Sequence, residues 1–208
     1  MSSAAKFKFI FLGDEFVGKT SIIQRFASNS FEEAYVNTIG MDLIPKKITV
    51  DDKPVRLQLW DTAGQERFRA LIPGYFRDAD VAVIVYDVVN RKSFDETASW
   101  AEEVRRERGD EVILALVGNK VDLTDLRQVS QEEGQQKAES LQATFFEASA
   151  RSGEGVREMF TDMARKLLGQ SSEQTLAGEG SEPPRRASQS HTLGELPPQE
   201  PISRTCAC

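Results

Sequence analysis

A short stretch near the start of the chain has the residue types that a phosphate-binding loop requires. Residues 13–20 read Gly-Asp-Glu-Phe-Val-Gly-Lys-Thr and fit the pattern G-x-x-x-x-G-K-[ST] directly after an apolar segment. Backbone N–H groups can converge on a polyanion only where side chains are absent, and Gly13 and Gly18 meet this need. Lys19 adds a positive charge for the outer phosphates, and the Thr20 hydroxyl can bind the Mg²⁺ that neutralises the same oxygens. The pattern predicts a nucleoside polyphosphate site, with a strand-to-helix turn carrying incidental glycines as the alternative.

A second motif indicates which base the nucleotide carries. Residues 119–122 read Asn-Lys-Val-Asp and follow an apolar segment. The Asp122 carboxylate can accept hydrogen bonds from both the ring N–H and the exocyclic amine of guanine, and adenine cannot reproduce this pair. A helix N-cap at Asp122 or Thr124 is the alternative for so short a motif. Its position behind a phosphate loop favours guanine recognition.

The cysteines and the histidine exclude several kinds of chemistry from the folded core. The chain has two cysteines, Cys206 and Cys208, and one histidine, His191, so its first 190 residues contain neither residue type. Cysteine nucleophiles, Ser-His-Asp triads, zinc sites and structural disulfides are therefore excluded there. Any chemistry must use hydroxyls, amides, carboxylates, Lys, Arg and the backbone.

Charge and hydropathy exclude further classes of function. Lys and Arg number 26 against 33 Asp and Glu, a net charge of -7, so we expect no nucleic acid partner. The longest apolar runs, Val81–Tyr86 and Val112–Val117, fall far short of the ~18 residues that suggest a membrane span. Lys6 and Lys8 interrupt the first apolar stretch and no small-residue cleavage site follows, so we expect no secretory signal.

Strand and helix patterns alternate around the two motifs. Strands are predicted in five segments: Lys6–Leu12, Leu57–Trp60, Val81–Tyr86, Val112–Val117 and Phe145–Phe146. Helical spacing occurs in four others: Thr20–Ala27, Phe94–Arg108, Gln131–Leu141 and Val156–Leu168. Such alternation indicates βαβ units, with ligands at the carboxyl ends of the strands. We expect an α/β fold with a mostly parallel sheet.

Composition divides the chain into two parts. Five of the eight prolines lie beyond residue 170, together with many Ser, Gln and Glu residues and no Phe, Tyr or Trp. Such a segment cannot bury enough apolar surface to offset the entropy of ordering it. We predict a folded domain over residues 1–169 and a disordered tail over residues 170–208, with Gln170–Thr205 as its linker.

These residues together resemble the Ras-like small GTPases, and within them the Rab branch. The resemblance covers about residues 6–169 and the last three positions. Besides the two motifs above, it rests on Trp-Asp-Thr-Ala-Gly-Gln-Glu-Arg-Phe at 60–68, Asn-Thr-Ile-Gly-Met-Asp at 37–42, Ser-Ala-Arg at 149–151 and Cys-Ala-Cys at 206–208. Residues 55–78, with Leu-Ile-Pro-Gly-Tyr at 71–75, are most similar to the Golgi-associated Rabs of retrograde and intra-Golgi traffic.

The resemblance implies a P-loop GTPase domain, an α/β fold with a six-stranded, mostly parallel sheet and helices on both faces. Its matching residues would bind Mg²⁺ and hydrolyse GTP. Thr20, Thr38 and Asp61 would hold the metal, and Thr38 would also sense the γ-phosphate. Lys19, the Gly64 N–H and Gln65 would serve hydrolysis, with Gln65 orienting the attacking water. Phosphoryl transfer needs positioning and charge neutralisation rather than a covalent nucleophile, which agrees with a core that lacks His and Cys.

The resemblance also assigns the contacts of the nucleotide. Phe31 would pack against the guanine, Lys120 would lie along base and ribose, and the Ala150 N–H would meet the guanine O6. The full set expected to contact GTP or GDP is Gly13, Glu15, Phe16, Val17, Gly18, Lys19, Thr20, Ser21, Phe31, Tyr35, Thr38, Gly64, Asn119, Lys120, Asp122, Ser149, Ala150 and Arg151. Structural alternatives stay open for four residues, namely core packing for Phe31 and Trp60, a turn for Asp61 and a solvated loop for Gln65.

Three positions depart from the family pattern. Glu15 stands in the phosphate loop where many small GTPases carry a small or neutral residue, and its carboxylate would repel the γ-phosphate or crowd Gln65. We hypothesise slow intrinsic hydrolysis, with a solvent-facing Glu15 as the alternative. Leu43 replaces an aromatic residue of the effector-facing patch, and Arg151 replaces the usual Lys.

The last residues and the switch segments imply the partners. Cys206 and Cys208 would accept two geranylgeranyl groups, and two lipids anchor a chain stably where one does not. Effectors would bind the switch regions, at Ile39, Gly40, Leu43, Trp60 and Tyr75. The resemblance also implies an exchange factor, a GTPase-activating protein, a Rab escort protein and a dissociation inhibitor, and we expect a monomer. Its expected location is the cytoplasmic face of Golgi or related vesicle membranes, with a cytosolic pool.

The expected function is a GTP-hydrolysing switch in vesicle traffic, and two alternatives stay open. Glu15 motivates a scaffold that binds GTP and barely hydrolyses it. A P-loop kinase or ATPase is the weaker alternative, because Asp122 opposes it and no second substrate domain is present in the sequence.

Overall fold

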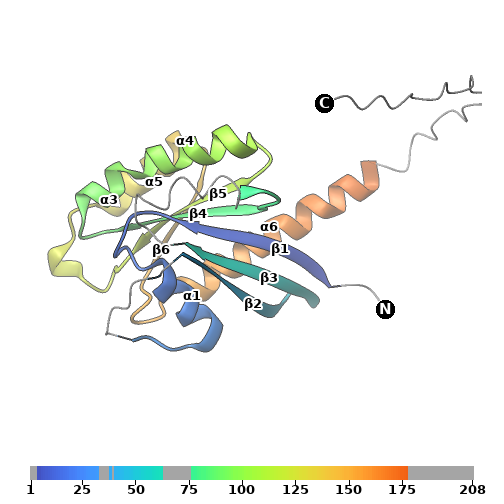
Figure 1. Ribbon diagram of the computed structural model, residues 1–208, viewed down its shortest axis with the longest axis horizontal. Helices are drawn as coiled ribbons and strands as arrows, with labels where there is room; N and C mark the ends of the chain where they lie inside the picture. Colours follow the sequence, from blue (N-terminus) through green and yellow to red (C-terminus); the bar gives the residue numbers. More distant parts are fainter. Residues whose placement is uncertain (1–3, 33–37, 39, 63–75, 178–208) are drawn as a thin grey trace, which may run out of the picture.

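A six-stranded sheet forms the centre of the molecule. The computed structural model describes residues 4–32, 38, 40–62 and 76–177, with side chains described up to residue 170. The strands are β1 (Ala5–Leu12), β2 (Met41–Val50), β3 (Lys53–Thr62), β4 (Val81–Asp87), β5 (Ile113–Asn119) and β6 (Thr144–Ala148). Their order is β2-β3-β1-β4-β5-β6, and every neighbouring pair is parallel except β2 with β3 (Figure 1). The predicted six-stranded, mostly parallel sheet is confirmed.

The strand β2 has no counterpart among the five predicted strands. It is an outermost strand of the sheet, and its side chains alternate between partly buried and exposed. The segment carries Pro45 and two lysines, Lys46 and Lys47, so it lacks the apolar run that identifies the buried strands. Antiparallel pairing with β3 through a tight turn at Asp51 and Asp52 makes it a strand.

Helices cover both faces of the sheet. They are α1 (Lys19–Ser28), α3 (Arg91–Asp95), α4 (Thr97–Arg108), α5 (Gln131–Ser140) and α6 (Val156–Ala177). One buried cluster joins a sheet face to α1 and α6, and a second cluster joins the other face to α3, α4 and α5 (Figure 1). In the described part of the chain, no helix is both long enough and apolar enough to cross a bilayer.

Two helices differ from the sequence prediction. The predicted helix over Phe94–Arg108 begins earlier, at Arg91, because the Asn90 side chain caps it by accepting a hydrogen bond from the Ser93 N–H. A turn at Glu96 then divides it into α3 and α4. The last helix does not end at Leu168 but continues through residues 170–177, so the start of the predicted disordered linker is helical.

The parallel strands place the predicted motifs together. The carboxyl ends of β1, β3, β4, β5 and β6 share one edge of the sheet. The phosphate loop follows β1, Asp61 lies near the end of β3, Asn119 ends β5, and Ser149 follows β6. This edge is therefore the candidate site.

Candidate functional site

Gly13 and Gly18 are the positions where the phosphate loop admits no side chain. Both have positive φ, 130° for Gly13 and 92° for Gly18. A Cβ at residue 13 would lie 2.2 Å from the Val85 carbonyl oxygen, and a Cβ at residue 18 would lie 2.3 Å from Asn119 Nδ2. The two glycines therefore let the loop pack against β4 and β5 as well as expose its backbone.

Lys19 is held inside the phosphate loop. Its buried Nζ donates hydrogen bonds to the Gly13 carbonyl (2.8 Å) and the Asp14 carbonyl (2.7 Å). Burial lowers the pKa of the Lys19 ammonium to about 8, against the opposing attraction of Asp61, Asp14 and Glu15. An anionic phosphate beside Nζ would restore the charged form, so this lysine is prepared for a polyanion.

Three oxygen-bearing side chains meet beside Lys19. Thr20 Oγ1 donates a 2.6 Å hydrogen bond to Asp61 Oδ2. Thr38 Oγ1 lies 2.7 Å from Thr20 Oγ1 and 3.5 Å from Asp61 Oδ2. Burial raises the pKa of Asp61, while the Thr20 hydrogen bond and the Lys19 charge pull it down. The structure thus brings together the three residues for which metal binding was expected.

These residues fit a magnesium ion. The other carboxylate oxygen of Asp61, Oδ1, is buried without a hydrogen-bond partner in the described part of the chain. The described residues contain no group of three acidic, His or Cys side chains that could hold a metal by itself. A set of two hydroxyls and one carboxylate suits Mg²⁺, which binds with few protein ligands and takes the rest from phosphates and water. The ion would neutralise charge on the phosphate oxygens.

The guanine half of the site is built around the Asn119 side chain. Its Nδ2 donates to the Val17 carbonyl (2.8 Å), and its Oδ1 accepts from the Ala150 N–H (3.1 Å). The Ser149 hydroxyl donates a 2.6 Å hydrogen bond to Asp122 Oδ1. One amide therefore ties the phosphate loop to the loop after β6, and the Ala150 N–H expected to meet the guanine O6 here donates to Asn119.

The family of the chain follows from this arrangement and from one comparison. A phosphate loop and an Asn-Lys-x-Asp motif lie at the same sheet edge, and residues 8–169 match the Ras family. The chain belongs to the Ras family. As a Ras-family GTPase, it binds GTP and GDP with Mg²⁺, hydrolyses GTP and switches its binding to effectors, under exchange factors and activating proteins.

An acidic residue of this GTPase that sequence reasoning missed lies beside Lys120. Lys120 has a positive φ of 70°, and its Nζ lies 2.6 Å from Asp87 Oδ2. Asp87 is buried, and its Oδ1 also accepts from the Val89 N–H at 3.0 Å. The ion pair holds the Lys120 side chain across the carboxyl ends of β4 and β5. The available signal was a carboxylate at the end of an otherwise apolar strand.

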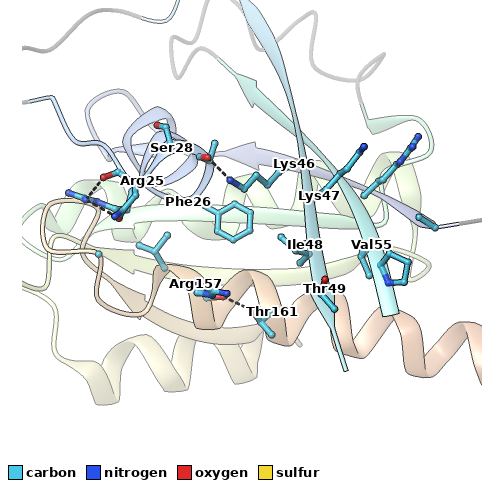
Figure 2. A pocket seen from close by; sticks show the side chains of 17 residues that line it. Arg25, Phe26, Ser28, Lys46, Lys47, Ile48, Thr49, Val55, Arg157 and Thr161 are labelled. Carbon is cyan, nitrogen blue, oxygen red and sulfur yellow. Dashed lines mark hydrogen bonds between the residues drawn. The ribbon is translucent and has the colours of Figure 1, made fainter. Parts of the chain in front are cut away.

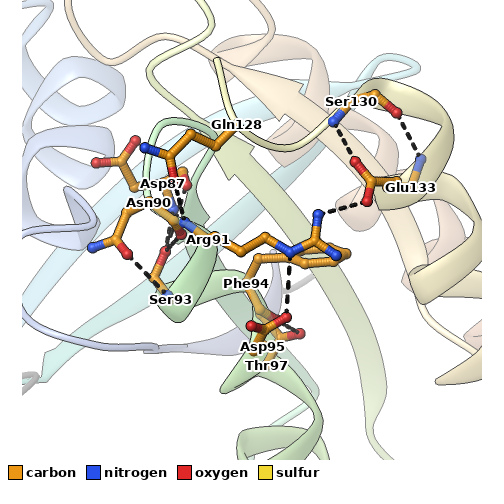
Figure 3. A network of polar contacts seen from close by, with 10 residues as sticks. All are labelled: Asp87, Asn90, Arg91, Ser93, Phe94, Asp95, Thr97, Gln128, Ser130 and Glu133. Atoms are coloured by element: carbon orange, nitrogen blue, oxygen red, sulfur yellow. Dashed lines mark hydrogen bonds and ion pairs between the residues drawn. The ribbon is translucent and has the colours of Figure 1, made fainter. Parts of the chain in front are cut away.

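A polar network supports the segment that carries Asp87 (Figure 3). The Arg91 guanidinium pairs with Glu133 at 2.5 Å and with Asp95 at 3.5 Å, and its backbone N–H donates to Gln128 Oε1 at 3.3 Å. Glu133 also accepts from the Ser130 N–H in the capping box of α5. The network therefore joins the start of α3 to the start of α5. The side chains that form the two ion pairs are 41–63% exposed, so these pairs contribute little to stability.

The other expected contact residues differ in how the structure places them. Phe31 is partly buried and packs against the α1 and α6 cluster, which agrees with the core alternative. Trp60 packs against the opposite cluster, while Leu43, its cross-strand neighbour, is 39% exposed. Glu15 is partly buried and Arg151 is exposed. The expected residues outside the described part of the chain are Tyr35, Ile39, Gly64, Gln65, Tyr75, Cys206 and Cys208.

Proposed function

We propose that this GTPase is a Rab-type switch of vesicle traffic at the Golgi, acting in retrograde or intra-Golgi transport. The carrying observation is the position of Thr38, a residue of the expected first switch, 2.7 Å from the phosphate-loop hydroxyl of Thr20. Because both hydroxyls can bind one Mg²⁺, the metal and the γ-phosphate would fix the first switch, and hydrolysis would release it. The family motifs at residues 37–42 and 60–68 support the assignment to the Rab branch.

The proposed reaction uses groups that position and neutralise. Gln65 would orient the attacking water, the Gly64 N–H would bind the γ-phosphate, and Lys19 would balance charge as the bond to the leaving oxygen lengthens. Intrinsic turnover is expected on the order of 10⁻⁴ s⁻¹, and an activating protein that supplies an arginine would raise it by ~10³ to 10⁵.

Nucleotide content and single-turnover hydrolysis test this proposal. The full chain, purified in Mg²⁺ buffer and denatured, should release a guanine nucleotide, mainly GDP. Hydrolysis of GTP loaded on the protein should be slow and should stop in Gln65→Leu. Release of adenine nucleotides, or equal hydrolysis by wild type and Gln65→Leu, would contradict the proposal.

A GTP-bound scaffold is the second candidate, and Glu15 supports it. The partly buried Glu15 carboxylate lies close enough to Lys19 for its negative charge to oppose part of the lowering that burial causes in the pKa of the Lys19 ammonium. A negative charge there opposes the γ-phosphate charge during hydrolysis. If the scaffold function is right, purified protein carries GTP, and Glu15→Gln hydrolyses it faster, whereas the control Glu158→Gln on the exposed face of α6 does not. Equal rates for all three proteins would exclude the effect of Glu15.

The proposed membrane anchor uses the last residues of the chain. Two geranylgeranyl groups on Cys206 and Cys208 would anchor the protein without a basic cluster. An escort protein would present the chain for lipidation, and a dissociation inhibitor would shield the lipids in the cytosol. In cells, Cys206→Ser with Cys208→Ser should move the protein from Golgi membranes to the soluble fraction. Equal membrane fractions for variant and wild type would exclude lipid anchoring.

The proposed effector surface lies beside the nucleotide site. Leu43 and Trp60 are cross-strand partners on β2 and β3, and Leu43 is exposed. Ile39, Gly40 and Tyr75 would complete this surface when GTP is bound. A leucine in place of an aromatic residue would select effectors with a smaller complementary contact. Leu43→Tyr should change which effectors bind, without changing the GDP release rate.

A further inference from the structure

Arg25, in the last turns of α1, contacts the loop that follows β6. Its Nε donates a 2.8 Å hydrogen bond to the Ala150 carbonyl, and its Nη2 donates a 2.6 Å hydrogen bond to the Arg151 carbonyl. These carbonyls belong to the segment whose Ala150 N–H is expected to meet the guanine O6. Arg25 on the first helix therefore fixes the backbone of residues 149–151, which we call the guanine-side loop.

The same guanidinium also holds the end of α1. Its Nη1 donates to the Asn29 carbonyl at 2.9 Å and lies 3.4 Å from Asn29 Oδ1. Asn29 ends the helix in the left-handed conformation, with its N–H bonded to the Arg25 carbonyl. The chain continues from there to Phe31 and the first switch. Arg25 thus joins the guanine-side loop to the entry of that switch.

Both peptide groups that flank the Cα atom of Ala150 are consequently held. The 149–150 peptide donates the Ala150 N–H to Asn119 Oδ1, and the 150–151 peptide accepts Arg25 Nε at the Ala150 carbonyl. Rotation about the backbone bonds of Ala150 would turn these two peptide groups relative to each other and break one of the hydrogen bonds, so Arg25 and Asn119 together fix the backbone that carries the Ala150 N–H. Because the contacts of Arg25 are charge-assisted, each is stronger than a neutral hydrogen bond.

The surroundings of Arg25 allow the residue to be changed. Arg25 lies at one end of a groove of about 950 Å³ between α1, the strands β2 and β3, and α6 (Figure 2). A shorter side chain would enlarge this open groove and leave no closed cavity in the core. Arg25 is only partly buried, and two of its hydrogen bonds to carbonyls lie at the exposed surface, so the fold should tolerate its replacement.

The structure assigns to Arg25 the role of a positioning residue that slows nucleotide release by fixing the guanine-side loop against the end of α1. The residue touches no reacting group and acts through the Ala150 and Arg151 peptides. This inference rests on the guanine nucleotide site of the proposed function. It adds a control on release that lies outside the phosphate loop and the Asn-Lys-x-Asp motif.

Release of a fluorescent GDP from the full chain tests the inference, with Arg105 as the matched control. Arg105 has the same local contact as Arg25, because its Nη1 donates to the carbonyl four residues on, Gly109, at the end of α4. It lacks contacts to the guanine-side loop among the described residues. Arg25→Gln should speed GDP release about tenfold, the effect of losing one or two net hydrogen bonds. Arg105→Gln should change release less than twofold.

A local measurement separates positioning from general loss of stability. Hydrogen exchange of the amides at 150–152 in the GDP-bound protein should rise in Arg25→Gln and stay unchanged in Arg105→Gln. Arg25→Lys, which keeps the charge and can reach one carbonyl, should give intermediate rates and serves if Arg25→Gln fails to fold. Equal release and exchange in the Arg25 and Arg105 variants would overturn the inference. Wild-type protein that binds no guanine nucleotide would instead overturn the proposed function.

Discussion

The indole Nε1 of Trp100 donates a 3.1 Å hydrogen bond to Asp14 Oδ1. Trp100 is 2% exposed in α4, and Asp14 is the second residue of the phosphate loop. The Asp14 carbonyl also accepts from Lys19 Nζ, so this residue is fixed through its side chain and its backbone. Through this hydrogen bond, α4, which packs against β4, stabilises the loop that binds phosphate.

Trp100→Phe should lower the free energy of unfolding by about 1 kcal/mol and weaken GDP binding several-fold. The substitution keeps an aromatic ring in the core but removes the Nε1 donor, which leaves a partly buried Asp14 carboxylate oxygen without this partner. Urea unfolding and GDP titration calorimetry measure the two effects.

A double-mutant cycle isolates the contact. Asp14→Ala should cost about as much as Trp100→Phe, and the double variant should cost less than the sum. Asp14→Asn keeps the Oδ1 acceptor and should behave much like wild type. Additive losses would show that the hydrogen bond contributes nothing.

The lowered pKa of Lys19 predicts that the protein takes up a proton when it binds GDP in alkaline solution. Burial lowers the pKa of the Lys19 ammonium to about 8 in the nucleotide-free protein, and bound phosphate raises it. At pH 8.5 about three quarters of the Lys19 side chains are therefore neutral before GDP binds, and they become protonated on binding. At pH 7.0 about nine tenths of them are already protonated in the nucleotide-free protein. Calorimetry in buffers of different ionisation enthalpy measures this uptake, and equal uptake at both pH values would contradict the prediction.

The same lowered pKa gives the nucleotide-free protein a pH-dependent stability. Because the folded pKa of Lys19 lies below its ordinary value of 10.5, the unfolded chain binds more protons between about pH 8 and 10.5. The contribution of Lys19 to the free energy of unfolding therefore rises with pH across this window and is constant below it. Lys19→Met should abolish this rise in urea unfolding of the nucleotide-free protein.

Removal of Mg²⁺ should speed GDP release from the wild type by tenfold or more, with Asp61 as the key protein ligand. A buried Asp61 Oδ1 without a partner among the described residues is the atom that the ion satisfies. Asp61→Asn should release GDP fast with or without chelator. Asp80→Asn is the control, since Asp80 directly precedes β4, and its carboxylate accepts the Lys8 N–H at the opposite end of the strands from the nucleotide site. A full chelator effect in Asp61→Asn would exclude this role.

Asp122→Ala should reduce the preference for GDP over ADP by about 10² to 10⁴, because two charge-assisted hydrogen bonds to guanine are lost. Ser149→Ala removes the 2.6 Å hydrogen bond that orients Asp122 and should reduce the preference by about tenfold or less. Competition between the two nucleotides for the full chain measures both. Unchanged selectivity between GDP and ADP in Asp122→Ala would contradict guanine recognition by Asp122.

Local chemistry made much of the fold predictable from sequence. The phosphate-loop motif with Gly13 and Gly18 and the apolar run of Val81–Tyr86 are patterns within a few residues, so the sequence reveals them. The groups that exclude a Cβ at the two glycines, the Val85 carbonyl and the Asn119 side chain, lie on distant strands and are visible only in the structure. The edge strand β2 escaped prediction because half of its side chains face solvent and its pairing with β3 depends on a neighbour.

By itself, the sequence determined the phosphate loop, the Asn-Lys-x-Asp motif and the α/β layers that bring both to one sheet edge. Only the tertiary structure decided which distant groups support them, namely Trp100 at Asp14, Asp87 at Lys120 and Arg25 at Ala150. The physical reason is that hydrogen bonds between residues far apart in the chain depend on how helices pack on the sheet. No local pattern of residue types encodes that packing.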